Sequence, residues 1–126
     1  MRRGTEVGRA ELAHRVAGAK LDPSRAALVV IDIQEAFRKA VPVFDDVARA
    51  AGVLVEGAKV VGTPIAITEQ YPKGLGATRA EISEVLPPEA PRLAKTSFSA
   101  LGAEGLVERL DALARTQVVV VGIETH

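Results

Sequence analysis

The stretch Gln117-Val118-Val119-Val120-Val121-Gly122, close to the end of the 126-residue chain, determines the fold class. An unbroken run of valines is typical of a strand that is buried on both faces of a parallel sheet. Such a strand needs neighbouring strands along its edges and helices over its faces. We therefore expect a covered parallel sheet, and an incomplete one, because the sequence ends at His126 soon after this strand.

The same kind of strand occurs twice earlier in the chain, each time followed by a helix. Residues 26–31 form an apolar strand, and residues 65–68 form a shorter one. Helical spacing of apolar residues predicts amphipathic helices over 43–61 and 104–113, and Gly62-Thr63-Pro64 ends the first of them. Alternating strands and helices, joined by right-handed crossovers, predict an α/β fold: a three-layer αβα sandwich around a parallel, Rossmann-like sheet. In the first helix we expect the buried stripe to be formed by Val47, Ala51, Leu54, Ala58 and Val61.

Shorter segments connect these elements. Residues 33–39 are expected to form a helical turn or loop, and residues 82–86 a helical turn. Residues 69–77 form a polar loop with glycine and proline. Three prolines over 87–91 force an extended connection toward residues 93–95, because the residue before a proline avoids the helical region.

The first residues differ from the rest, and we predict an N-terminal extension over 1–21. It is either a loosely docked extension or a segment with a short amphipathic helix over 11–20, and we expect His14 to be solvated. Asp22-Pro23-Ser24 is a turn signal that begins the domain proper, over 22–126.

The amino-acid composition narrows the classes of function that this chain can have. The chain is 48% hydrophobic and 25% charged, which is typical of a globular domain, and its 16 basic and 16 acidic residues balance. This balance gives no electrostatic reason to bind nucleic acid or an anionic membrane. No apolar stretch approaches the roughly 20 residues that span a bilayer. No apolar segment follows the basic N-terminus, so we expect no secretory signal. The chain contains no cysteine.

Asp32 and Lys95 are the first candidate site residues. Asp32 ends an otherwise apolar strand, at the sheet edge where α/β proteins bind ligands. A partly desolvated carboxylate there needs a partner. Alternatively, Asp32-Ile33-Gln34-Glu35 is a capping box, with Asp32 as the N-cap. Lys95, between apolar and small residues, is either a solvated loop residue or the partner of Asp32.

The loop after the second strand emerges from the same sheet edge. It reads Glu69-Gln70-Tyr71-Pro72-Lys73-Gly74-Leu75-Gly76. Tyr71 could be one wall of a small-molecule pocket, or the segment could be a simple Pro-Gly turn. Neither the Walker spacing nor GxGxxG is present, which disfavours a mononucleotide-binding half-domain.

Four motifs in this order resemble the isochorismatase-like cysteine hydrolase family, most closely its isochorismatase domain-containing branch. The resemblance runs from about Asp22 to His126. The motifs are Val29-Val30-Ile31-Asp32-Ile33-Gln34, Thr68-Glu69-Gln70-Tyr71-Pro72-Lys73-Gly74-Leu75-Gly76, Ala94-Lys95-Thr96-Ser97-Phe98-Ser99 and Val121-Gly122-Ile123-Glu124-Thr125-His126.

The resemblance implies a catalytic triad of Asp, Lys and Cys. Asp32 matches the base that takes the thiol proton, and Lys95 matches the lysine that supports the pair electrostatically. The nucleophilic cysteine is expected just beyond His126. A non-proline cis peptide is expected near Ile123 and Glu124, where the backbone helps to form the oxyanion hole. The pocket and oxyanion region would comprise Gln34, Phe37, Tyr71, Ile123 and Glu124.

The resemblance also bears on metal and function. Nicotinamidase-type relatives carry Asp and His metal ligands in the loop after the second strand, whereas this loop has no histidine. We therefore expect no metal and no cofactor. The leading hypothesis is a cytoplasmic hydrolase of a small molecule. This chain would be a C-terminally truncated and inactive member of that class, and it could form a homo-oligomer. The alternative is a non-catalytic module that binds a small molecule or a partner.

Overall fold

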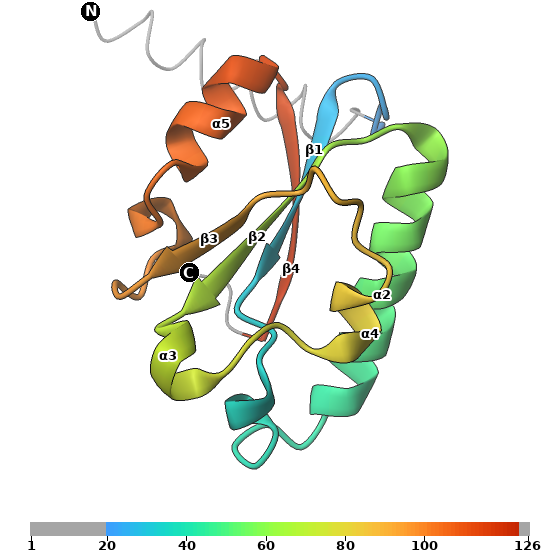
Figure 1. The fold of residues 1–126 in the computed structure, drawn as a ribbon. Coiled ribbons are helices and arrows are strands. Elements are labelled where there is room, and N and C mark those ends of the chain that lie inside the picture. The colour runs from blue at the N-terminus through green and yellow to red at the C-terminus, as the bar shows by residue number, and fades with distance from the viewer. Residues whose placement is uncertain (1–19, 124–126) are drawn as a thin grey trace, which may run out of the picture.

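The computed structural model describes residues 20–123 (Figure 1). The predicted helix over 11–20 lies outside these residues except for Lys20. Glu124 lies outside them as well, and so does the cis peptide that is expected next to it. Nearly all of the predicted extension over 1–21 lies outside them as well, so its boundary stays a prediction.

Four parallel strands form one sheet. They are β1 (Ala26–Ile31), β2 (Ile65–Gln70), β3 (Arg92–Lys95) and β4 (Gln117–Gly122), in the order β3-β2-β1-β4. The central strand β1 pairs with both neighbours, for example Leu28 with Ile65 on one side and with Val119 on the other. The predicted α/β class and parallel sheet are confirmed.

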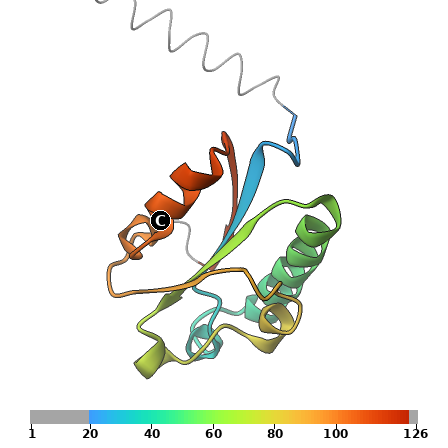
Figure 2. The same cartoon turned by 45° about the horizontal axis from the view of Figure 1, so that its top comes forward.

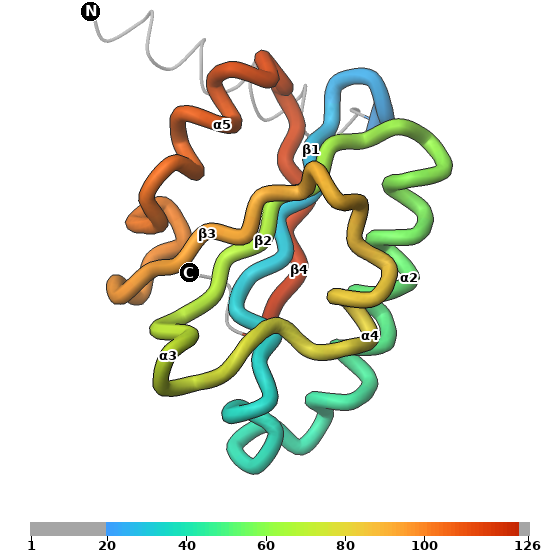
Figure 3. Tube along the Cα trace, viewed as in Figure 1, coloured from blue at the N-terminus to red at the C-terminus, as the bar shows by residue number. Residues whose placement is uncertain are grey.

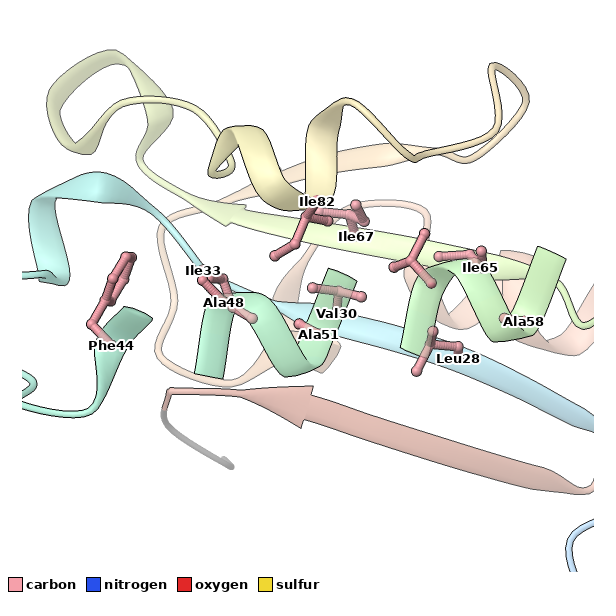
Figure 4. Close-up of a cluster of buried hydrophobic side chains, with 11 residues drawn as sticks. Leu28, Val30, Ile33, Phe44, Ala48, Ala51, Ala58, Ile65, Ile67 and Ile82 are labelled. Carbon is pink, nitrogen blue, oxygen red and sulfur yellow. The ribbon is translucent and has the colours of Figure 1, made fainter. Parts of the chain in front are cut away.

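Helix α2 (Phe44–Val61) and the short α4 (Ala80–Ser83) cover one face of the sheet. Gly62, in the left-handed region with φ of 74°, ends α2. Gly52 lets α4 approach closely, because a Cβ there would lie 2.8 Å from the carbonyl oxygen of Glu81. Figure 4 shows the resulting main core, whose buried members are Leu28, Val30, Ile33, Phe44, Ala48, Ala51, Val55, Ala58, Ile65, Ile67 and Ile82.

The opposite face carries η2 (Ala100–Gly102) and α5 (Leu106–Leu113), so the sheet lies between two helical layers (Figure 2). Helix α5 begins after Gly105, two residues later than predicted, because Gly105 adopts a φ of 89° outside the helical region. The second, smaller core lies between the sheet and this layer, and its buried members are Val29, Ile31, Ala66, Ala100, Ala103 and Leu106.

The connections differ from the prediction in three places. No strand was predicted after the extended connection over 87–91, yet β3 follows it and pairs with β2 from Ile67↔Arg92 to Gln70↔Lys95. Strand β2 continues to Gln70, and the predicted polar loop contains the short helix α3 (Pro72–Leu75). Residues 33–39 do form a turn, η1 (Glu35–Phe37).

Strand β4 lies at one edge of the sheet, beside β1 alone among the described strands (Figure 3). Val118 is 48% exposed and Val120 is 46% exposed. The prediction that this valine run is buried on both faces is therefore wrong for the described residues, because no described element covers the outer part of β4 on the α5 side.

Candidate active site

The carboxyl ends of β1 and β3 bring Asp32 and Lys95 together. Lys95 Nζ lies 2.7 Å from Asp32 Oδ2, and the side chains are 1% and 18% exposed, respectively. The expected proximity of the two residues is confirmed. An ion pair this well buried is costly to form, because both charges lose water, so its geometry must supply compensating bonds.

Hydrogen bonds around Lys95 provide that compensation. Its ammonium donates to Gln70 Oε1 at 2.6 Å, to the carbonyl of Ser97 at 3.0 Å and to the carbonyl of Phe98 at 3.1 Å. An ammonium has three N–H groups and no acceptor. With Asp32 as a fourth partner, Lys95 is fully occupied by the protein. It can therefore stabilise a charge on Asp32, but it has no N–H left over for a further ligand.

The backbone turns sharply at Asp32, which has a positive φ of 53° that is uncommon outside glycine. Its N–H donates to the carbonyl of Thr68 at 3.1 Å, and its Oδ1 accepts from Thr68 Oγ1 at 2.7 Å. The turn directs the carboxylate over the sheet edge toward β2 and β3. Because the carboxylate stays partly exposed, it can accept a proton from a group that approaches from outside.

The alternative interpretation of Asp32 as a helix cap is wrong. The residue before η1 is Gln34, and no side chain caps this turn. Glu35, which was expected to complete the capping box, instead forms ion pairs with Arg38 and Arg79, each at 2.7 Å. The Asp32 carboxylate is thus committed to Lys95 and Thr68.

Glu35 belongs to a rim of partly exposed charges next to this turn, made up of Glu35, Arg38, Asp45, Arg79 and Glu81. The hydrogen bond from Arg38 lowers the pKa of Glu35, and the hydrogen bond from Arg79 lowers the pKa of Glu81. In turn, Glu35 and then Asp45 raise the pKa of Arg38. Solvent-accessible pairs of this kind contribute little to stability. The rim therefore affects the local electrostatic field more than it affects the stability of the fold.

Three further predicted residues occupy different environments. Gln34 is fully buried, and its amide bonds to the backbone of Gln70, at the end of β2, and of Gly76, in the loop that follows. Phe37 packs against the main core. Tyr71 is 54% exposed and lines a hollow of about 420 Å³ that also borders Lys95 and Thr96. Whether these residues contact a substrate stays a prediction.

Ile123 is partly buried against the main core, close to the described end of the chain.

A second hollow, of about 430 Å³, lies at the opposite end of the sheet and is lined by Lys59, Pro64 and Arg109. We assign the site to the carboxyl edge, because the buried ion pair lies there.

Thr68 and Gln70 are site residues that the sequence analysis did not identify. Both lie on β2, and their side chains reach Asp32 and Lys95, respectively. The alternation of a strand puts residues 68 and 70 on one face. Extending the predicted strand from residue 68 to residue 70 would have placed both beside Asp32.

Metal binding was not expected, and this stays a prediction. Within residues 20–123, no cluster of three or more His, Cys, Asp or Glu side chains could hold an ion. Glu69, on β2, is 9% exposed, and its Oε2 accepts from the N–H and the Oγ1 of Thr78 at 2.6 and 2.9 Å.

Titrating the chain with Zn²⁺ in a calorimeter at neutral pH is therefore expected to give only weak heats that do not saturate. The physical reason is that a tight zinc site needs about four ligands, usually including histidine or cysteine. Saturation near one ion per chain, abolished in Glu69→Gln, would contradict the expectation.

Among residues 20–123, no helix has the length and apolar character needed to cross a membrane.

Comparisons with known proteins identify similar sequences and similar folds. The model of the Isochorismatase domain family matches residues 26–126. Isochorismatase domain-containing protein 1 of Danio rerio is 35% identical over 106 residues, which are 84% of this chain and 37% of that protein. A structure described as MAR1 ribonuclease from Caenorhabditis elegans superposes with a TM-score of 0.77 at 34% identity, over 84% of this chain and 54% of that chain.

The YcaC gene product of Escherichia coli, described as an octameric hydrolase of unknown specificity, shares the fold. Its TM-score is 0.74 at 24% identity, over 83% of this chain and 53% of that chain. The chain thus spans about half the length of these solved relatives and less of the Danio rerio protein. From the family match and the shared fold, the chain belongs to the isochorismatase domain family.

Proposed function

We propose that Asp32 and Lys95 are two of the three catalytic groups of a hydrolase that acts on a small molecule through a cysteine thiolate. The observation that supports this most is the ion pair between Lys95 and Asp32, at 2.7 Å, with the lysine buried and the carboxylate partly open. Buried charge pairs at the carboxyl edge of an α/β sheet are typical of functional sites.

In this proposal Asp32 accepts the proton of the thiol, and the resulting thiolate attacks the substrate carbonyl carbon. The carbon–sulfur bond forms, and the leaving group departs with the proton that Asp32 returns. Water then breaks the carbon–sulfur bond and regenerates the thiol. Lys95 stays bound to Asp32 throughout and stabilises the carboxylate when it is charged.

The remaining pocket residues have supporting roles in the proposal. The backbone near Ile123 and Glu124 would donate hydrogen bonds to the oxyanion that develops on the substrate. Phe37 and Tyr71 would border the substrate pocket, and Gln34, which is 0% exposed, would support the pocket from behind. We propose no metal and no cofactor for this reaction.

The thiol itself is missing from these 126 residues, which contain no cysteine. By this mechanism they are inactive on their own. The expectation that the chain is truncated stays a prediction. Coding DNA that continues beyond His126 into a cysteine codon, in any frame, would supply the nucleophile.

Fusing the chain to a C-terminal part of a relative that carries the cysteine is expected to produce a reactive thiol. Asp32→Asn in this fusion should slow alkylation by iodoacetamide at pH 7 roughly a hundredfold, since a positioned base contributes about 10²–10⁴-fold. Asp45→Asn, which alters a carboxylate that is 60% exposed, is the matched control and should leave the rate unchanged. Equal alkylation rates in both variants would remove Asp32 as the base.

The alternative is a non-catalytic module that binds a small molecule or a partner, and the lack of cysteine favours it. It predicts saturable ligand binding by the 126 residues without turnover. Because one similar structure is described as a ribonuclease, RNA belongs among the substrates tested, although the balanced charge of this chain gives no support for RNA binding.

Homo-oligomerisation is proposed from the exposed β4 edge and from the octameric YcaC. Cytoplasmic location stays a prediction.

A further inference from the structure

Gln34 connects two backbone segments that both approach the Asp32–Lys95 pair. Its Oε1 accepts from the N–H of Gln70 at 2.8 Å, and its Nε2 donates to the carbonyl of Gln70 at 2.9 Å. The same Nε2 donates to the carbonyl of Gly76 at 2.7 Å. One side chain therefore holds both backbone groups of Gln70 and the far end of the loop that follows β2.

This arrangement uses both N–H donors of the buried amide and also its carbonyl oxygen. A side-chain amide offers two N–H donors and one carbonyl acceptor, and Gln34 directs all three to fixed backbone groups. The residue is 0% exposed. A fully satisfied buried amide is a rigid contact, because any displacement leaves polar groups unpaired at a cost of about 1–3 kcal/mol each.

Gln70, which Gln34 holds, is itself a direct partner of the lysine. Gln70 Oε1 accepts from Lys95 Nζ at 2.6 Å, the shortest bond that the ammonium makes, and Gln70 Nε2 donates to the carbonyl of Thr96 at 3.3 Å. The backbone on the other side of Gln70 is tied to β3, since the N–H of Tyr71 donates to the carbonyl of Lys95 at 2.8 Å.

Gln34 is also tied to the other member of the pair. Its N–H donates to the carbonyl of Asp32 at 3.0 Å, and the two residues lie on the same sharp turn after β1. A continuous series of contacts thus runs from the turn at Asp32, through the Gln34 amide and Gln70, to Lys95, and the ion pair closes the ring.

We propose that Gln34 is a positioning residue: through Gln70 it fixes the Lys95 ammonium against the Asp32 carboxylate. The significance of this role for catalysis rests on the proposed function, but the ring of contacts does not. Catalytic groups must be held within a fraction of an ångström, and supporting hydrogen bonds supply that rigidity. Gln34 then acts on the reaction without touching the substrate.

The test is acylation of lysines in the 126-residue chain by a small amine-reactive ester, followed by mass spectrometry. Exposed Lys39 and Lys73 are internal references. In the unmodified chain we expect Lys95 to be labelled at least tenfold more slowly than they are. Gln34→Met keeps the length of the side chain but removes its polar bonds, and it should raise the Lys95 rate about tenfold relative to the references.

Three variants complete the design. Gln70→Met should raise the Lys95 rate as Gln34→Met does, whereas Gln70→Glu keeps an acceptor for the ammonium and should leave it low. Gln117→Met is the matched control. Gln117 also joins two backbone groups, the N–H of Asp22 and the carbonyl of Lys20, but at the opposite end of the sheet, so the Lys95 rate should not change.

Hydrogen exchange of peptides covering residues 70–78 is the second measurement, and Gln34→Met should accelerate it locally. An unchanged Lys95 rate in Gln34→Met would overturn the proposal. So would a rise of all lysines together, which would reduce Gln34 to a residue of general stability. The assay needs neither thiol nor substrate, so its result is independent of whether the hydrolase proposal fails.

Discussion

Replacing Asp32 with alanine is expected to destabilise the fold by about 3–5 kcal/mol, because it leaves a buried ammonium without its counter-charge. The Lys95 side chain is only 1% exposed. Its remaining acceptors, on Gln70, Ser97 and Phe98, satisfy N–H groups but carry no charge. This loss is large beside the roughly 5–15 kcal/mol by which domains are stable.

The double variant Asp32→Ala with Lys95→Met is expected to be more stable than Asp32→Ala alone. Removing both charges removes the uncompensated one, and apolar replacement of a buried pair is often neutral or stabilising. Urea unfolding of the two single variants and the double variant, at equal protein concentration, gives the coupling energy. The control pair is Arg38→Met with Asp45→Ala, on the exposed rim, where a much smaller coupling is expected. Additive effects of the Asp32 and Lys95 changes would show that the buried pair has no energetic coupling.

The fold could be predicted where the hydrophobic pattern was long. The strands at 26–31 and 65–68 and the helix at 43–61 needed only the apolar run or the helical spacing, and all three exist. Strand β3 could not be predicted from the sequence pattern, because Arg92-Leu93-Ala94-Lys95 contains no β-branched residue and follows three prolines. It is a strand because β2 offers it an edge, which is a tertiary effect.

The face of α2 was predicted less well than the helix itself. Ala51 and Ala58 are buried as expected, whereas Leu54 is 42% exposed and Val61 is 54% exposed. The buried stripe runs through Phe44, Ala48, Ala51, Gly52, Val55 and Ala58. Several residues of this stripe are small, and one of them, Gly52, lets α4 pack closely against α2. Hydrophobicity alone favoured the larger Leu54 and Val61.

The site was predictable only in its charged members. Asp32 stands out as the one acidic residue directly after an apolar strand, and a buried lysine was the natural partner to look for. The neutral members could not be found in this way. Gln34 and Gln70 are polar residues in a polar segment, and their significance comes from backbone groups brought within 3 Å of the Gln34 amide by the loop between Gln70 and Gly76.

The edge strand β4 leads to the second large expected effect: the 126-residue chain should self-associate. Among the described strands β4 pairs only with β1, so the hydrogen-bonding groups along its other side are open to another chain. The exposed Val118 and Val120 line an apolar hollow of about 300 Å³ beneath α5. Covering such a side chain is worth roughly 1.5–3 kcal/mol when burial is complete.

Sizing chromatography is expected to show a species larger than the 13.2 kDa chain. Val120→Lys should shift it to the monomer position, because a lysine on a strand edge opposes pairing with a second chain. The matched control is Val60→Lys, which makes the same change at a position on α2 that is 84% exposed and far from the sheet edge. If the unmodified chain were a monodisperse monomer with a sharp thermal transition, the open edge would be tolerated in water. The 126 residues would then behave as a self-sufficient unit, and the interaction module would replace the hydrolase as the leading interpretation of what they do.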